Sequence, residues 1–321
     1  MKLVCGIDVS KDTLDLHYNT ASGNEVSLRV KNNEKGHLKI LEVCGQRTYL
    51  MEASGPYYLK LACTLKQEGG DVRVENPVRI RRYIQMGLER NKNDKKDARW
   101  LYRYALERGG QVWQLPSEEA LRCSAITASI DLLTRQKTAI TNQVHSLKQL
   151  PGDHRELTRT LTKMMMTLAK EIKVLEQKLL ATLKQWKGDQ LTSISSIPGL
   201  GKRATALLIT MTNGFKKIQN HRQLIALAGL APREHTSGSS IKGKKGICKM
   251  GSGHLRNVLY MCSLSAIQHN KACKELYERL KKAGKKSKVA LIAVCNKLLK
   301  QAFAIATKGT TYQADFKSQL A

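Results

Sequence analysis

The sequence predicts an α/β region followed by α-helical regions: an N-terminal mixed sheet with helices on its faces, a central antiparallel coiled-coil hairpin and a mainly helical C-terminal part. Three observations predict this class. Short strand-like runs alternate with helical stretches near the start, two near-heptad apolar series follow, and helical spacing then returns around a loop rich in glycine, serine and lysine. We place the domain boundaries at 1–112, 113–190 and 191–321.

Strands and helices alternate in the N-terminal region. An apolar, β-branched run at the start predicts a buried strand, and alternating patterns after it predict two hairpin partners. A polar cap then opens a stretch with helical spacing, and Pro56 stands where another helix begins. The predicted elements, in order, are strands at 3–9, 13–18 and 26–30, a helix at 32–44, a strand at 48–52, a helix at 57–67, a strand at 71–74 and a helix that Asp94 opens.

Four acidic residues stand where ligand sites form in α/β sheets. Asp8 lies in or at the end of the first strand and Glu52 ends a later one, while Asp94 and Asp97 share a helix face. Acids brought together there repel one another unless a cation lies among them, and oxygen ligands suit Mg²⁺ or Mn²⁺. The alternative is four solvated surface acids, and spacing alone does not decide.

The central region predicts two long helices with coiled-coil spacing. The first apolar series is Ile126, Ile130, Leu133, Ile140, Val144 and Leu147, and the second runs from Leu161 to Trp186. Between them, Leu150-Pro151-Gly152-Asp153 predicts a turn. The two seams either close on each other within the chain or pair with another protomer, and the heptads alone do not decide.

Positive charge is concentrated in the C-terminal region. The chain carries a net charge of +29, and residues 201–321 contain 23 Lys and Arg against 4 Asp and Glu. A polyanion would neutralise this self-repulsion, which indicates a nucleic acid as partner. The alternative, a solubilising basic surface, usually interleaves acidic residues.

Two motifs in this region are suited to contact phosphate. Residues 194–206 have the form of a helix-hairpin-helix, in which Gly199, Gly201 and Lys202 offer backbone N–H groups and a cation; a purely structural turn is the alternative. The segment 228–251 predicts a loop or short hairpin, whose glycines allow close approach to a ligand. The cations expected to bind nucleic acid here are Arg233, Lys242, Lys244, Lys245, Lys249 and Arg256.

The cysteines and the hydropathy pattern bear on the compartment. Eight cysteines lie far apart, without a CxxC pair or zinc-type spacing, which predicts reduced thiols of a cytosolic protein. We find no uninterrupted apolar run near the roughly 18–20 residues that span a bilayer, and the first residues lack the order of a signal peptide. Secretion and membrane insertion are therefore not expected.

Three N-terminal blocks resemble a known family. Gly6-Ile7-Asp8-Val9-Ser10-Lys11, Met51-Glu52-Ala53-Ser54-Gly55 and Lys92-Asn93-Asp94-Lys95-Lys96-Asp97-Ala98 look like the motifs of the DEDD insertion-sequence transposases, the IS one-ten / IS eleven-eleven family that includes the Piv DNA invertase. The family's N-terminal domain resembles the RuvC resolvase, a ribonuclease H-like fold. The resemblance implies that Asp8, Glu52, Asp94 and Asp97 hold Mg²⁺ or Mn²⁺. Asn93 departs from the usual Thr or Ser without affecting a catalytic position.

The C-terminal blocks extend this resemblance. Gly229-Leu230-x-Pro232, a Ser-Gly pair and Lys249-x-Gly251-x-x-x-Leu255-Arg256 are similar to the second conserved domain of the same transposases. There the serine of Ser-Gly is the nucleophile, which implies that role for Ser237, with Ser239 and Ser240 as rivals. The resemblance further implies a dimerising coiled coil and, in members of the family, a noncoding RNA that pairs with target and donor DNA.

The expected function is that of an insertion-sequence DNA transposase or recombinase. Ser237 would attack a backbone phosphate and hold the cut end covalently, aided by Mg²⁺ at the four acids. The expected partners are donor and target duplex DNA, a noncoding guide RNA and further copies of the chain, as a homodimer or a tetramer. The expected location is the cytoplasm of a prokaryote, at the nucleoid.

Two other functions remain open at this point. A RuvC-like, metal-dependent junction resolvase or nuclease would use water as its nucleophile, and its serine loop would only bind. A basic nucleic-acid-binding protein with a decayed acid site is a non-enzymatic possibility, against which the presence of all four acids speaks. Serine chemistry leaves protein attached to DNA on a denaturing gel, whereas hydrolysis does not.

Overall fold

The computed structural model describes residues 2–87, 94–216, 218–233, 236–237, 241–242 and 246–315; the side chains of 94–95, 236–237 and 241–242 lie outside that description. The chain separates into two compact units, Met1–Leu115 and Pro116–Ala321. The first combines a sheet with helices, and the second contains helices and two short β pairs. The helical hairpin groups with the helices after it, so the predicted boundary at 190 stays a prediction.

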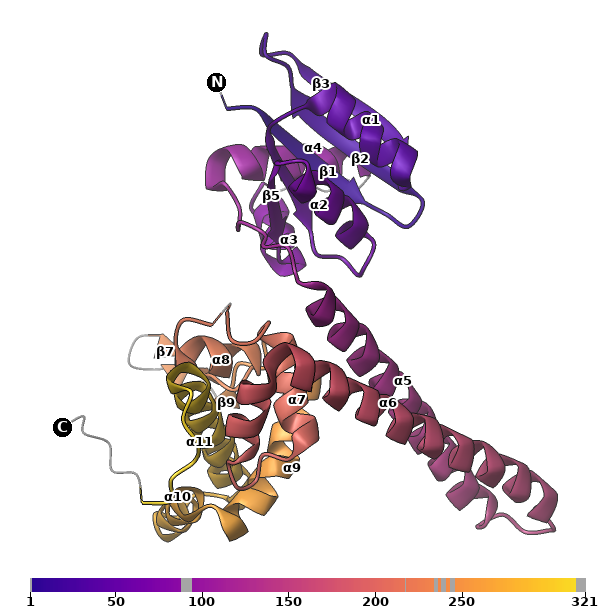
Figure 1. Ribbon diagram of the computed structural model, residues 1–321, viewed down its shortest axis with the longest axis vertical. Coiled ribbons are helices and arrows are strands. Elements are labelled where there is room, and N and C mark those ends of the chain that lie inside the picture. The colour runs from indigo at the N-terminus through magenta and orange to yellow at the C-terminus, as the bar shows by residue number, and fades with distance from the viewer. Residues whose placement is uncertain are drawn as a thin grey trace. The chain divides into compact units, whose positions relative to one another are not determined.

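The first unit is built on a five-stranded mixed sheet in the order β3-β2-β1-β4-β5 (Figure 1). β1, β2 and β3 pair antiparallel as consecutive hairpins, whereas β4 joins β1 and β5 joins β4 in parallel. Parallel neighbours need crossover connections, which the intervening helices supply. The strands are β1 Val4–Val9, β2 Thr13–Asn19, β3 Glu25–Lys31, β4 Thr48–Glu52 and β5 Asp71–Glu75. The predicted strands are confirmed to within one residue at each end.

Helices cover both faces of this sheet. One pair packs on the face that carries Ile7 and Met51, and the other pair packs around Val4 and Leu50 on the opposite face. Alternation of side chains along β1 and β4 produces these two apolar clusters. The first pair is α1 Glu34–Cys44 and α2 Tyr58–Gln67, and the second is α3 Pro77–Met86 and α4 Asp94–Arg108.

The second unit begins with a two-helix arm, which Figure 1 shows as an antiparallel pair. Its helices are α5 Glu118–Leu147 and α6 Arg155–Ser195. Both predicted helices are present, and they turn at the predicted Pro-Gly pair. Ile126 and Ile130 are buried near the base, whereas Leu133 and Ile140 further along the arm are only half-buried. The backbone of α6 leaves helical geometry at Lys187, close to the predicted end of the arm.

The remaining helices surround one apolar core. They are α7 Lys202–Met211, α8 His221–Leu227, α9 Gly253–His269, α10 Lys271–Lys282 and α11 Ser287–Lys308. Leu183 and Ile194 of α6 share this core with Leu208 of α7 and Leu259 of α9. All eight cysteines are free thiols and at least partly buried, as expected.

One helix bears on the hydropathy pattern. Within the described part of the chain, α11 alone is long and apolar enough to cross a membrane by length and composition. Lys297 and Lys300 interrupt its apolar residues, so it contains no uninterrupted apolar run of bilayer length. Val294, Leu298 and Ala302 of α11 are completely buried in the protein core. These residues belong to the apolar core of the second unit.

Candidate functional site

Carboxylates from four neighbouring strands form a row across one face of the sheet. Antiparallel pairing places Asp15 of β2 beside Asp8 of β1, and parallel pairing places Glu75 of β5 beside Glu52 of β4. The register between β1 and β4, continued by one residue, joins Asp8 to Glu52. Paired residues project to the same side of a sheet, so the two predicted acids Asp8 and Glu52 lie at the centre of the row.

α4 covers this face because Gly6 of β1 has no side chain. A Cβ at Gly6 would lie 2.4 Å from the carbonyl oxygen of Ala98, so a larger residue would push the helix away. Gly6 and Asp8 share a face of the sheet. The first turn of α4, which carries Asp94 and Asp97, therefore begins close to the acid row. Asp97 is half-buried, as Asp8 is.

The two outer carboxylates of the row are balanced by protein donors. Asp15 is 4% exposed and accepts a hydrogen bond from Nε of Arg29 at 2.8 Å. Glu75 is 2% exposed and accepts from the backbone N–H groups of Gln111 at 2.8 Å and Asn76 at 3.2 Å. Such donors are what a buried charge requires. Glu52, in the middle of the row, has no comparable donor among the described residues.

Nearby carboxylates also affect the pKa values of two tyrosines of α4, Tyr102 and Tyr104. Burial, and then the charge of Glu75, raises the pKa of the Tyr104 phenol. Burial, and then the charge of Glu25, raises the pKa of Tyr102. The charges of Glu75 and Glu25 thus add to the effect of burial on these two phenols, while Arg79 and Arg108 oppose it at Tyr104.

The donor set suits a divalent cation, although the structure does not assemble the complete predicted site. Asp8, Glu52 and Asp97 offer only carboxylate oxygens, which Mg²⁺ and Mn²⁺ prefer. Among the side chains that the structure describes, no three Asp, Glu, His or Cys groups lie close enough to hold one ion. The side chain of Asp94 lies outside the described part. The four-acid site stays a prediction, which the acid row and the placement of α4 support.

In the second unit, the predicted helix-hairpin-helix joins α6 to α7. Gly199 adopts a φ of +99°, and a Cβ there would lie 2.6 Å from the Cβ of Ala266 in α9. Both the backbone and the packing therefore require glycine at this position. Gly201 caps α7, and an added Cβ would meet nothing within 4 Å. Because Gly201 and Lys202 are exposed, this end of α7 is open to a phosphate.

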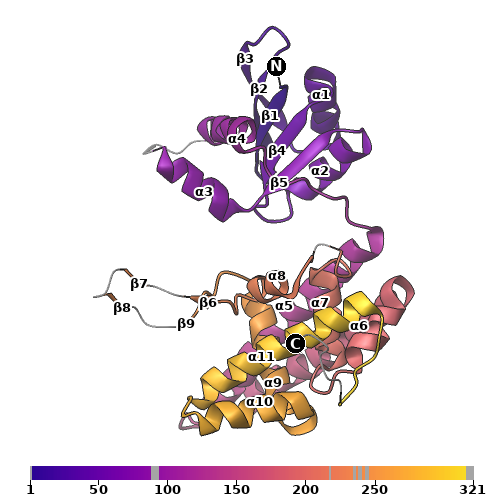
Figure 2. The same ribbon diagram turned by 90° about the vertical axis from the view of Figure 1, so that its left-hand side faces the viewer.

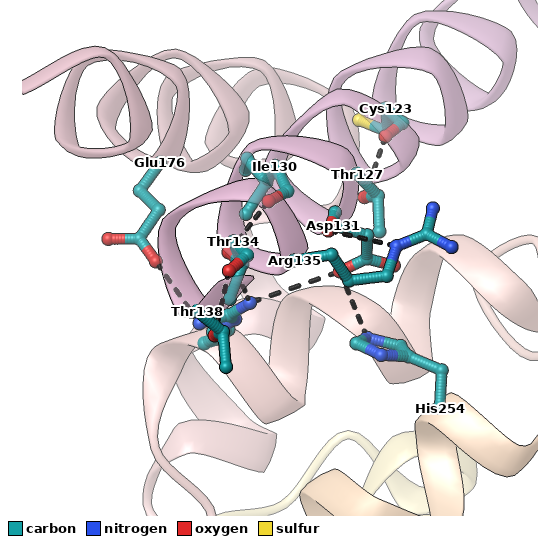
Figure 3. A network of polar contacts seen from close by, with 10 residues as sticks. Cys123, Thr127, Ile130, Asp131, Thr134, Arg135, Thr138, Glu176 and His254 are labelled. Carbon is teal, nitrogen blue, oxygen red and sulfur yellow. Dashed lines mark hydrogen bonds and ion pairs between the residues drawn. The ribbon is translucent and has the colours of Figure 1, made fainter. Parts of the chain in front are cut away.

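A polar network fixes the start of α7 against the arm. Arg203 lies 3.9 Å from a carboxylate oxygen of Asp131 in α5 and 3.8 Å from one of Glu176 in α6. His254 of α9 approaches Asp131 to 3.3 Å (Figure 3). A cavity of about 240 Å³ beside these charges is also lined by Lys202. The sequence did not predict these contacts of Asp131 and Glu176. In the sequence, an acidic residue next to a heptad seam looks the same as one that is exposed to solvent and makes no contact.

The serine segment leaves the core between α8 and α9 through a tight base. A Cβ at Gly251 would lie 2.5 Å from the backbone nitrogen of Gly229, so the two chain segments meet without side chains between them. Arg256 donates at 2.9 Å to the backbone carbonyl that ends α8, and it is half-buried. Arg256 thus shapes the base, whereas the predicted nucleic-acid contacts Arg233 and Lys249 are exposed.

The segment itself forms a β-hairpin, as the sequence allowed. β6 Pro232–Arg233 pairs with β9 Gly246–Ile247, and β7 Thr236–Ser237 pairs with β8 Ile241–Lys242, both antiparallel. The backbone of Ser237 is therefore part of a strand that lies beyond the tight base. Outside the described residues lie Ser239, Ser240, Lys244 and Lys245, and so do the side chains of Ser237 and Lys242.

Comparison with known proteins matches nearly the whole chain. A DEDD family model described as "Transposase" matches residues 5–151, and a model described as "Transposase IS116/IS110/IS902 family" matches residues 191–278. The pilin gene-inverting protein of Moraxella bovis is 26% identical over 317 residues, which cover 95% of either chain. The transposase for insertion sequence element IS1328 of Yersinia enterocolitica is 25% identical, over 96% of this chain and 97% of the relative. The transposase for IS1111A of Coxiella burnetii is 23% identical, over 97% and 91%.

Proposed function

We propose that this protein, a member of the IS116/IS110/IS902 family of insertion-sequence transposases, cuts and rejoins DNA strands through Ser237. It belongs to this family because two family models and relatives matched over most of their length together cover most of the chain. The observation that carries the strand-cleavage part of the proposal is the acid row of the first unit. Asp8 and Glu52 occupy adjoining positions there, beneath the helix whose first turn carries Asp94 and Asp97. Such a row of acids can hold a divalent cation, and the cation would stabilise the negative charge on a reacting phosphate.

In this proposal Asp8, Glu52, Asp94 and Asp97 hold Mg²⁺ in a ribonuclease H-like sheet. When bound, Mg²⁺ supplies positive charge to the reacting phosphate and lowers the pKa of a coordinated hydroxyl. The outer acids Asp15 and Glu75 are already satisfied by protein donors, which leaves the centre of the row as the place for a cation. The four-acid set contains only oxygen ligands, in keeping with Mg²⁺ or Mn²⁺.

Ser237 acts as the nucleophile of the proposed reaction. Its hydroxyl oxygen forms a bond to a backbone phosphorus, and the bond from that phosphorus to one bridging oxygen breaks. The serine hydroxyl loses its proton as the new bond forms, and the bridging oxygen takes up a proton and leaves as a strand-end hydroxyl. The other strand end stays attached to Ser237. No water is consumed, so the reverse attack by another strand end can rejoin the DNA. The hairpin position of Ser237, inside the segment that matches the family, supports this role.

The basic surfaces of the second unit bind the nucleic acids in this scheme. The open end of α7, with Gly199, Gly201 and Lys202 at the turn, contacts a DNA phosphate. The same stretch of sequence adds five cations that we propose to bind nucleic acid, namely Arg233, Lys242, Lys244, Lys245 and Lys249, while Arg256 donates to the backbone at the base of the hairpin. The charge of +29 suits two nucleic-acid partners, so a noncoding guide RNA beside the duplex DNA is part of the proposal. The site of action is then the nucleoid of a prokaryotic cytoplasm.

The arm supplies an assembly surface in the same proposal. Its apolar seam is only half-buried at Leu133 and Ile140, and Leu157 and Met164 of α6 are 57% and 52% exposed. Apolar side chains that stay exposed contribute no hydrophobic stabilisation to an isolated arm. A second copy of the arm would cover them and bury their apolar surface. We therefore propose a dimer through the arm, and a tetramer on paired DNAs, because strand exchange needs active sites on both duplexes.

A protein–DNA adduct tests the proposed chemistry directly. Wild-type protein with Mg²⁺ and labelled DNA that carries its element's ends is expected to give a covalent adduct on a denaturing gel. Ser237→Ala is expected to lose both cleavage and adduct while it still binds DNA, and Ser237→Cys to keep a trace of both. Ser239→Ala and Ser240→Ala are the matched controls, which should behave as the wild type. An adduct that survives Ser237→Ala contradicts the assignment, and cleavage without any adduct supports the hydrolytic alternative.

A further inference from the structure

We propose that the turn between α10 and α11 is a second nucleic-acid surface, which binds the phosphodiester backbone separately from the serine hairpin. The α10–α11 corner is defined by five lysines: Lys281, Lys282, Lys285, Lys286 and Lys288. The inference rests on the proposed function only in that the protein acts on nucleic acid. It does not depend on which group is the nucleophile.

Much of the positive charge of the second unit lies outside the serine hairpin and the helix-hairpin-helix, in residues 257–315. Within residues 257–315, there are 11 Lys and Arg and only 3 Asp and Glu. One of these acids, Asp315, forms an ion pair with Lys271, whose Nζ lies 2.7 Å from its Oδ1. Repulsion within such a stretch disfavours the folded state unless an anionic partner relieves it.

The lysines of the α10–α11 corner are accessible to a partner. Every residue from 281 to 288 is exposed to solvent. Lys281 donates to the hydroxyl of Ser287 at 3.1 Å, and none of the five lysines has a carboxylate partner among the residues that the structure describes. Their ammonium groups are therefore free to contact phosphates, and most of the corner lysines have no contact to lose in doing so.

Three of these lysines do not help the fold. Lys281 and Lys282 lie in the last turn of α10, where cations interact favourably with the helix dipole. Lys285, Lys286 and Lys288 instead surround the start of α11, where anions are favourable and cations are not. Lys286 even occupies the N-cap position, without a side-chain cap bond, and the first turn of α11 contains no acid. Their placement therefore has a cost to stability that binding of a polyanion offsets.

The corner continues into a basic groove between the two helices. α10 and α11 run side by side (Figure 2), and a groove of about 700 Å³ between them is lined by three cations, Arg279, Lys297 and Lys300, and by one acid, Glu275. Lys297 and Lys300 are three residues apart and share a helix face. Arg279, two residues before Lys281, thus adds a cation next to the corner, and Lys297 and Lys300 add two more along α11.

Removal of the three unfavourably placed lysines tests the inference. In the full-length protein, Lys285/Lys286/Lys288→Gln is compared with the wild type for binding to a 30-base-pair duplex DNA and to an RNA hairpin, across a salt series. Each lost phosphate contact lowers the log–log salt slope by about one unit, so a fall of about two to three units and at least about ten-fold weaker binding near 0.1 M salt are expected. A loss confined to one probe identifies DNA or RNA as the partner. The melting temperature is expected to stay the same or rise.

The matched control removes the same charge elsewhere. Lys35, Lys39 and Lys60 are exposed on α1 and α2, away from the acid row, and their triple change to Gln is expected to leave the slope nearly unchanged. Equal losses in both triple variants would mean that net charge alone matters, and an unchanged slope in the corner variant on both probes would overturn the surface. The Ser237 adduct, measured at low salt and saturating protein, is expected to persist in the corner variant. That readout separates failure of this inference from failure of the proposed chemistry.

Discussion

At the scale of single residues, the acids of the sheet differ in how their charge is balanced. Asp15 and Glu75 were not predicted as neighbours of the site, because their alignment with Asp8 and Glu52 follows from strand register, which no local motif carries. They are held by Arg29 and by backbone N–H groups. We infer that these donors keep the outer acids from competing for the cation.

The pair formed by Asp15 and Arg29 gives a prediction at this scale. Arg29→Gln leaves the carboxylate of Asp15, 4% exposed, without its 2.8 Å donor and next to Asp8. Loss of the partner of a buried charge costs about 1–3 kcal/mol, so the free energy of unfolding is expected to fall by that amount in urea titrations. The control is Arg99→Gln, whose half-exposed pair with Glu25 at 3.4 Å is worth below about 1 kcal/mol. Equal effects in the two variants would show that burial of Asp15 is unimportant.

At the scale of elements, the contact of α4 with β1 determines where Asp94 and Asp97 lie. Gly6→Ala places a Cβ 2.2 Å from the backbone nitrogen of Tyr102, and backbone cannot move aside as a flexible side chain does. We expect a loss of stability of at least about 1–3 kcal/mol and, because α4 shifts, loss of Mg²⁺-dependent cleavage. Thermal unfolding and a cleavage assay measure the two effects. Gly201→Ala is the control for stability, since its Cβ meets nothing within 4 Å. A Gly6→Ala protein as stable and active as the wild type would refute the close contact between β1 and α4.

The elements also show how far sequence reasoning reaches. The strands and the arm helices were predicted, because period-two and near-heptad patterns are local. The helix α3 was missed, since only Ile80 and Tyr83 of its ten residues are buried and its basic residues hide the apolar spacing. The cluster of Arg203, Asp131 and His254 was missed as well, because it joins residues from three helices that only the folded chain brings together.

At the scale of the whole molecule, the exposed apolar residues of the arm predict assembly. The double change Leu157/Met164→Ser removes two side chains that lie seven residues apart on one side of α6 and are 57% and 52% exposed. Light scattering with DNA is expected to give a mass of at least a dimer for the wild type and a smaller mass for the variant, with an unchanged melting temperature. Leu38/Met86→Ser, at exposed positions of the first unit, should leave the mass unaltered. A wild-type complex that is monomeric and active would contradict assembly through the arm.

In the proposed function, the acid row is the metal-dependent centre for DNA strand cleavage by the whole molecule. The most direct test compares cleavage of labelled DNA by the wild type, Asp8→Asn and Asp12→Asn in Mg²⁺ and in EDTA. Asp12 is exposed four residues after Asp8, so the control makes the same chemical change outside the row. We expect that Asp8→Asn binds DNA but does not cleave it, that Asp12→Asn cleaves as the wild type does, and that EDTA stops both active proteins. Cleavage by Asp8→Asn at the wild-type rate, or cleavage that continues in EDTA, would contradict the assignment of these acids.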